Sequence, residues 1–209
     1  MRKLLCSALL GAAMSSLTAS AIAGGGFLET APSNNGSGGV FMDLTPLGPS
    51  LRVTSFDVSY TGTSGTNVDV QVWTRPGSYV GFTGGSGGWT LTQTVVGTRG
   101  GTTVWTPLVL TTPILLQAGE TTAVYLHCVT AGGGIRYTGT TALPPQTTWE
   151  NGDLRLFSDV ARTGDIAFGG TLFTPRTFSG RVHYELVPAP GAIALLGVAG
   201  LVTRRRRRS

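Results

Sequence analysis

Short runs of alternating apolar and polar residues, separated by glycine-rich turns, most constrain the fold of this chain. Val68, Val70 and Val72, for example, alternate with polar neighbours, as expected for one face of a half-buried strand. Between residues 24 and 188 no window has the apolar spacing of an amphipathic helix. The predicted strands cover residues 51–60, 68–73, 89–96, 103–110, 121–128, 154–157 and 180–187.

This pattern predicts an all-β fold, a single antiparallel β-sandwich of jelly-roll type over residues 40–187. Turns too short for a crossover connection favour antiparallel pairing. Over residues 51–60 the alternation places Val53 on the same face as Ser55 and Asp57. Residues 24–39 are rich in Gly, Ser and Asn and predict a flexible leader. Residues 139–152 are expected to form a long surface loop.

The first 23 residues have the three parts of a secretory signal peptide, which we expect to form a signal helix. Arg2 and Lys3 provide the positive start, and residues 4–14 are apolar. Ala21 and Ala23 are the small residues that signal peptidase requires before its cleavage site. We therefore expect export and removal of residues 1–23.

The other end of the chain predicts a short membrane anchor. Residues 189–203 carry no charge and would form a transmembrane helix of roughly 22 Å at 1.5 Å per residue. That length is below the roughly 30 Å of a bilayer core, so the anchor would be marginal. The arginines that follow would stay on the cytoplasmic side of the membrane. They are Arg204, Arg205, Arg206, Arg207 and Arg208.

A short motif precedes this anchor, formed by Val187, Pro188, Ala189, Pro190 and Gly191. Together with the apolar segment and the basic end, it resembles the PEP-CTERM sorting signal over residues 188–209, although Ala189 stands where that family usually has an acidic residue. The resemblance implies processing by an exosortase in a Gram-negative-type bacterium. It also implies an intermediate anchored in the inner membrane, followed by delivery to the cell surface or extracellular matrix.

The charge of the chain is unevenly distributed. The formal net charge is +5, yet residues 24–187 contain eight Arg, no Lys and ten acidic residues, which leaves −2. The basic residues outside the body belong to the two terminal segments. Nucleic acid is therefore not an expected partner, because the body lacks the basic surface that such binding requires.

The body offers little catalytic machinery. Its histidines are His127 and His183, and no nucleophile elbow, Walker loop or zinc-binding helix motif is present. Cys128 is the sole cysteine of the body, and its neighbour His127 would point to the opposite face of a strand. We therefore expect Cys128 to be a small buried apolar residue and the protein to have no catalytic residues.

Two groups of residues could instead bind a ligand. Glu150, Asn151 and Asp153 could coordinate calcium through loop oxygens, although Asn-Gly in this segment favours a simple turn. No other metal or cofactor is expected. Trp73 and Trp89, with Tyr79 and Trp149, could form a stacking platform for sugars or belong to the core.

These features predict a non-enzymatic exported surface or matrix protein. Its processing partners would be signal peptidase and an exosortase, and extracellular polysaccharide is a further candidate partner. The alternative is a surface-displayed carbohydrate- or calcium-dependent binding module.

Overall fold

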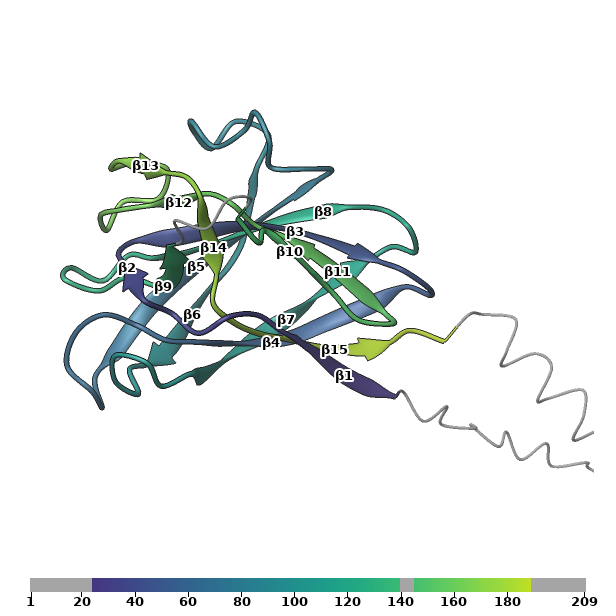
Figure 1. Ribbon diagram of the computed structural model, residues 1–209, viewed down its shortest axis with the longest axis horizontal. Helices are drawn as coiled ribbons and strands as arrows, with labels where there is room; N and C mark the ends of the chain where they lie inside the picture. Colours follow the sequence, from purple (N-terminus) through teal and green to yellow (C-terminus); the bar gives the residue numbers. More distant parts are fainter. Residues whose placement is uncertain (1–23, 140–144, 189–209) are drawn as a thin grey trace, which may run out of the picture.

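A computed structural model describes residues 24–139 and 145–188, and this part of the chain is all-β (Figure 1). It contains strands β1 to β15 and no helix. The prediction of an all-β, antiparallel fold is confirmed, because every pairing between these strands is antiparallel. The predicted signal helix and C-terminal transmembrane helix lie outside the described residues.

Three sheets make up the fold. The four-stranded sheet has the order β1 (Gly25–Glu29), β15 (Gly180–Leu186), β4 (Leu51–Val58) and β7 (Thr106–Leu116). The large sheet has the order β10 (Thr148–Glu150), β11 (Leu154–Phe157), β3 (Gly39–Pro46), β8 (Thr122–Cys128), β5 (Asn67–Pro76) and β6 (Thr90–Thr98), with β12 (Ala161–Arg162) and β13 (Leu172–Phe173) beside β3. The small third sheet has the order β14 (Arg176–Phe178), β9 (Arg136–Gly139) and β2 (Asn35–Gly36).

The main core lies between the four-stranded sheet and the large sheet, which form two layers (Figure 1). Inward-facing residues from both layers are fully or almost fully buried there, including Val40, Met42, Val70, Val72, Phe56 and Val182. Burial of this apolar surface, at about 25 cal/mol per Å² removed from water, is what holds the layers together. The architecture is therefore sandwich-like.

A β-bulge in β4 corrects the predicted facing of its residues. Tyr184 of β15 lies opposite Val53, and His183 lies opposite Ser55, so Thr54 is an extra residue without a partner. The extra residue shifts the alternation by one position. Val53 and Phe56 are consequently both buried in the core, whereas Ser55 is half-buried on the other face. The prediction that Val53 shares a face with Ser55 and Asp57 is wrong.

The prediction of a flexible leader over residues 24–39 is also wrong. Residues 25–29 form β1, which pairs along its whole length with β15, and residues 35–36 form β2, which pairs with β9. Leu28 is 4% exposed and belongs to the main core. The backbone hydrogen bonds of an edge strand do not require side chains, so a glycine-rich segment can still pair. The expected loop over 139–152 likewise contains a strand, β10, paired with β11.

Candidate functional site

The two ends of the described body leave the fold side by side. Gly25 of β1 lies opposite Glu185 of β15. The Leu186 N–H donates to the Gly24 carbonyl oxygen at 3.1 Å. Figure 1 shows the start of β1 and the end of β15 at the same corner of the molecule. We call this corner the exit end, because both predicted terminal segments adjoin it.

The body holds the chain as far as the first residue of the predicted sorting motif. The Val187 N–H donates to the Ser50 carbonyl oxygen at 2.9 Å. Pro188 is exposed and is the last residue that the structure describes. The remaining predicted processing residues, Ala21, Ala23, Ala189, Pro190, Gly191 and Arg204 to Arg208, lie outside the described residues. No spacer therefore separates the folded body from the start of the motif.

The loop of residues 150–154 joins the two layers at the exit end. The Asn151 Oδ1 atom accepts hydrogen bonds from the backbone N–H groups of Asp153 and Leu154, each at 2.9 Å. Its Nδ2 donates to the Phe27 carbonyl oxygen of β1 at 3.1 Å and to the Tyr184 hydroxyl at 2.9 Å. Asn151 thus closes a turn in the large sheet and also fastens it to the four-stranded sheet.

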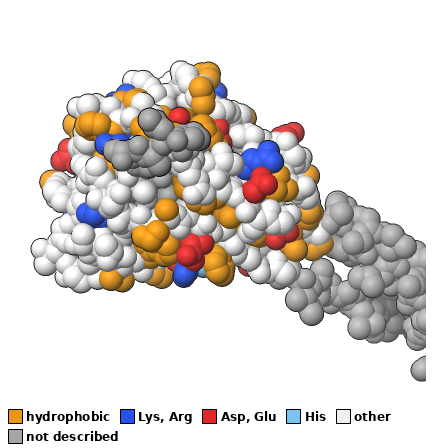
Figure 2. Space-filling model, viewed as in Figure 1, with side chains coloured by type: hydrophobic (Ala, Val, Ile, Leu, Met, Phe, Trp, Pro, Cys, Tyr) orange, Lys and Arg blue, Asp and Glu red, His pale blue; other side chains and the backbone are white. Residues whose placement is uncertain are grey.

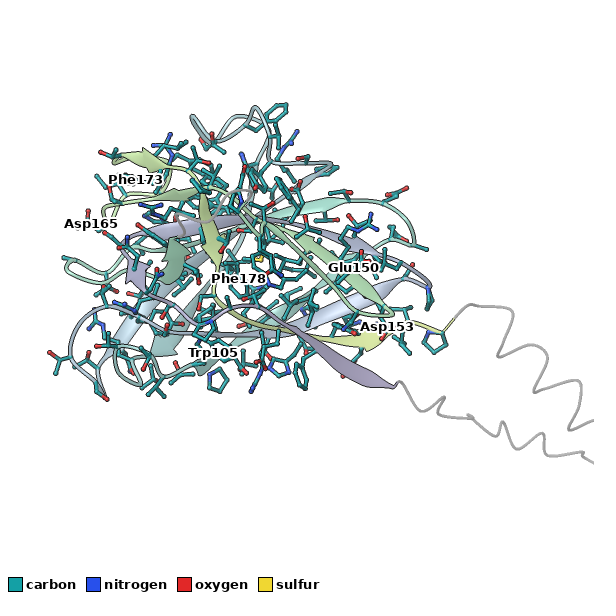
Figure 3. All side chains as sticks on the ribbon, in the orientation of Figure 1. Trp105, Glu150, Asp153, Asp165, Phe173 and Phe178 are labelled. Carbon is teal, nitrogen blue, oxygen red and sulfur yellow. The ribbon has the colours of Figure 1, made fainter. Side chains whose placement is uncertain are left out.

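The two carboxylates of this loop have separate protein partners. Glu150 pairs with Arg155 at 2.8 Å. Asp153 accepts a hydrogen bond from the Tyr184 hydroxyl at 3.0 Å, and both acidic residues lie near the exit end (Figure 3). Across residues 24–139 and 145–188, no three His, Cys, Asp or Glu side chains gather as metal ligands would. The segment thus forms the turn that its Asn-Gly pair favours, and a calcium-binding role for Glu150, Asn151 and Asp153 stays a prediction.

Replacing Asn151 with Ala is expected to lower the free energy of unfolding by about 2 kcal/mol, because four hydrogen bonds between the layers and within the turn are lost. Urea denaturation measures the effect. Glu150→Gln is the matched control in the same loop, and it should cost about 0.5 kcal/mol or less, because the Glu150–Arg155 pair is half exposed. Equal effects of the two substitutions would contradict the role of Asn151.

Three of the aromatic residues predicted as a sugar platform, Trp73, Tyr79 and Trp89, belong to a second apolar cluster or pack against it. This outer cluster covers the face of the large sheet that points away from the main core, and it consists of Phe41, Tyr79, Trp89, Ala123 and Tyr125, with Trp73, Phe157, Val160, Ala167 and Phe168 packed around them. Trp89 is only 8% exposed. Trp73 is half-buried and Trp149 packs against the main core. Trp89 and Tyr79 are therefore buried, whereas Trp73 and Trp149 are half-buried.

Arg162 fastens the segments that cover this cluster. Its guanidinium donates to the Thr83 carbonyl oxygen at 2.9 Å and to the carbonyl oxygens of Gly169 and Gly170 at 3.1 and 3.0 Å. Residues 77–89 and 158–170 are thus joined over the outer face of the large sheet. Sequence reasoning missed this cover, because its anchoring partners are backbone carbonyls, which leave no sequence signal.

Cys128 and His127 point to opposite faces, as predicted. Cys128 is buried in the main core, whereas His127 lies on the side of the outer cluster with its Nδ1 2.6 Å from the Tyr125 hydroxyl. Burial raises the pKa of the Cys128 thiol. An activated thiol needs the opposite shift, so the two residues do not form a nucleophile–base pair.

Residues 24–139 and 145–188 contain no helix that is long and apolar enough to cross a bilayer. No protein-family model matches the chain, and no curated protein matches it.

Proposed function

We propose that this protein is a non-enzymatic component of a bacterial cell surface or extracellular matrix, built on one jelly-roll-like sandwich. The signal peptide exports it, residues 189–203 hold it in the inner membrane, and an exosortase then separates the body from the anchor near residues 188–190. The body takes part in this processing only by presenting the signal peptide and the C-terminal sorting segment to their processing enzymes.

The closeness of the two chain ends at the exit end supports this proposal. Gly24 and Leu186 are hydrogen-bonded neighbours, and Val187 is held against Ser50. A protein tethered through either terminal segment would therefore meet the membrane with the same corner and project the same surfaces away from it. Signal cleavage after Ala23 would leave β1 complete, since β1 begins at Gly25.

Cell fractionation tests the proposal. In a host with an exosortase, we expect the wild-type body in the envelope or the medium. Replacing all of Arg204 to Arg208 with Ser should release an uncut chain past the membrane, because a segment of roughly 22 Å depends on its basic end for retention. Replacing the same five residues with Lys keeps the charge and should preserve sorting. Full-length protein that stays in the cytoplasm would overturn the proposal.

A further inference from the structure

The outward face of the four-stranded sheet is an ordered grid of side chains, and its apolar members Phe27, Leu115 and Val109 are about half exposed or more. Alternation and the strand registers place three rows across it, in which each residue lies opposite the next: Gly25, Glu185, Arg52 and Leu115; Phe27, His183, Ser55 and Val109; Glu29, Arg181, Asp57 and Pro107. Figure 2 shows hydrophobic, acidic, basic and histidine side chains together along the lower edge of the molecule, below this sheet.

Ion pairs and ring contacts hold the third row in place. Arg181 pairs with Glu29 at 2.7 Å, and its guanidinium carbon lies 5.1 Å from the Phe27 ring centre and 5.2 Å from that of Trp105. Asp57 accepts a hydrogen bond from the Nε2 atom of His183 at 2.8 Å. One face of the Phe27 ring therefore has the Arg181 guanidinium over it, and the side chain remains 50% exposed. Trp105 lies at the lower side of the sheet (Figure 3).

A shallow depression of about 320 Å³ opens beside the Phe27 ring. Its lining includes Gly25, Thr54, His183 and Glu185. Gly25 supplies no side chain at the end of its row, which leaves the space open. The bulge in β4 adds Thr54 to the lining, and bulges commonly redirect a side chain in this way. The depression is thus a consequence of two local features, a glycine and an extra residue.

The polar groups of this depression are available to a ligand. Within the described part of the chain, the Thr54 hydroxyl and the Glu185 carboxylate make no side-chain hydrogen bond, and His183 uses only its Nε2 atom. Thr54, Glu185 and His183 therefore line the same space as the half-exposed Phe27 ring. This combination suits a ligand with an apolar face and several hydroxyl groups.

We infer that this depression binds a neutral hexose unit of a polysaccharide, packed against Phe27 and hydrogen-bonded by Thr54, His183 and Glu185. The grid carries three carboxylates and two guanidinium groups, so it does not favour a polyanion. The inference rests on the proposed function for the source of the ligand, since a surface or matrix protein meets polysaccharide after export.

Calorimetric titration of the purified full chain with neutral gluco-, galacto- and manno-oligosaccharides, up to about 10 mM, tests the inference. We expect one of these series to bind, with little change in affinity when salt rises from about 50 to 500 mM. Phe27→Ala should weaken binding about tenfold through loss of the ring contact. Gly25→Leu should block it, since a Cβ at Gly25 meets no atom closer than 3.4 Å and the added side chain can occupy the depression.

Val109→Ala is the matched control, because Val109 is 65% exposed in the same row as Phe27 but on the far strand β7. It should bind like the wild type. Thr54→Val, which keeps the shape and removes the hydroxyl, should weaken binding about threefold or more. The absence of binding by all three series would overturn the inference, and so would binding that Gly25→Leu and Thr54→Val leave unchanged. Because the titration uses purified protein, its failure leaves the export proposal intact, and failed export leaves the titration valid.

Discussion

Replacing Phe41 with Ala is expected to destabilise the protein by about 3–5 kcal/mol, the range for a large aromatic removed from a core. Phe41 is fully buried at the centre of the outer cluster. Its ring stacks on Tyr125 with centres 3.8 Å apart and planes inclined by 3°. Tyr79 and Trp89 contact it from the sides, with ring centres at 5.8 and 5.7 Å. The covering segments would lose the surface on which they pack.

Chemical denaturation followed by tryptophan fluorescence measures this effect. Phe27→Ala is the control, because Phe27 is 50% exposed. This substitution should lower the free energy of unfolding by about 1 kcal/mol or less. A small cost at Phe41, equal to that at Phe27, would mean that the outer face of the large sheet is open. It would also support the interpretation of Trp73 and Trp89 as a ligand platform.

Acid is expected to destabilise the protein through His127. Burial lowers the pKa of His127 to about 4, Asp165 opposes the shift, and Arg162 adds to it. The unfolded chain has a histidine pKa near 6.5, so between about pH 6.5 and pH 4 the unfolded state binds a proton that the folded state excludes. Stability therefore falls as the pH drops through this window, by up to about 3 kcal/mol. The His127 Nε2 atom is buried and has no hydrogen-bond partner among the described residues. A proton added to this atom in the folded state would therefore be poorly solvated, which agrees with the lowered pKa.

The measurement is the free energy of unfolding of wild type and His127→Asn as a function of pH. We expect the difference between the two proteins to be constant above pH 7 and to shift in favour of the variant by about 3 kcal/mol toward pH 4. Using the difference removes the contribution of Asp43, whose pKa burial raises. Parallel pH profiles of the two proteins would contradict the assignment of the acid sensitivity to His127.

Alternation was sufficient to predict the strands that have one buried face. The bounds of β5, β11 and β15 lie within three residues of the predicted ranges, because the inward and outward residues of these strands differ in exposure. β8 was also predicted, although both of its faces are buried. β3 was not predicted as a separate strand. Its burial extends over both faces, since the outer cluster covers the side that a simple sandwich leaves open, and its apolar run therefore does not alternate.

Backbone-level features of the site could not be predicted in this way. β1 is glycine-rich, and its pairing with β15 depends on backbone groups rather than on side-chain pattern. The bulge at Thr54 breaks the period within β4 at a position that no single residue marks. The turn at Asn151 was favoured correctly from its Asn-Gly pair, yet the link from Asn151 to Phe27 and Tyr184 spans residues far apart in sequence. Phe27 was therefore placed in a leader, and the predicted sugar platform was assigned to Trp73 and Trp89, of which Trp89 is buried and Trp73 half-buried.

Intact mass spectrometry of the mature protein, recovered from the envelope and the medium of an exosortase-containing host, tests the central proposal most directly. We expect an N-terminus at Gly24 and a C-terminus at or close to residues 188–190, so that the mature chain ends just after Val187, whose N–H donates to the Ser50 carbonyl oxygen. The mass of the complete 209-residue chain, with both terminal segments retained, would contradict it.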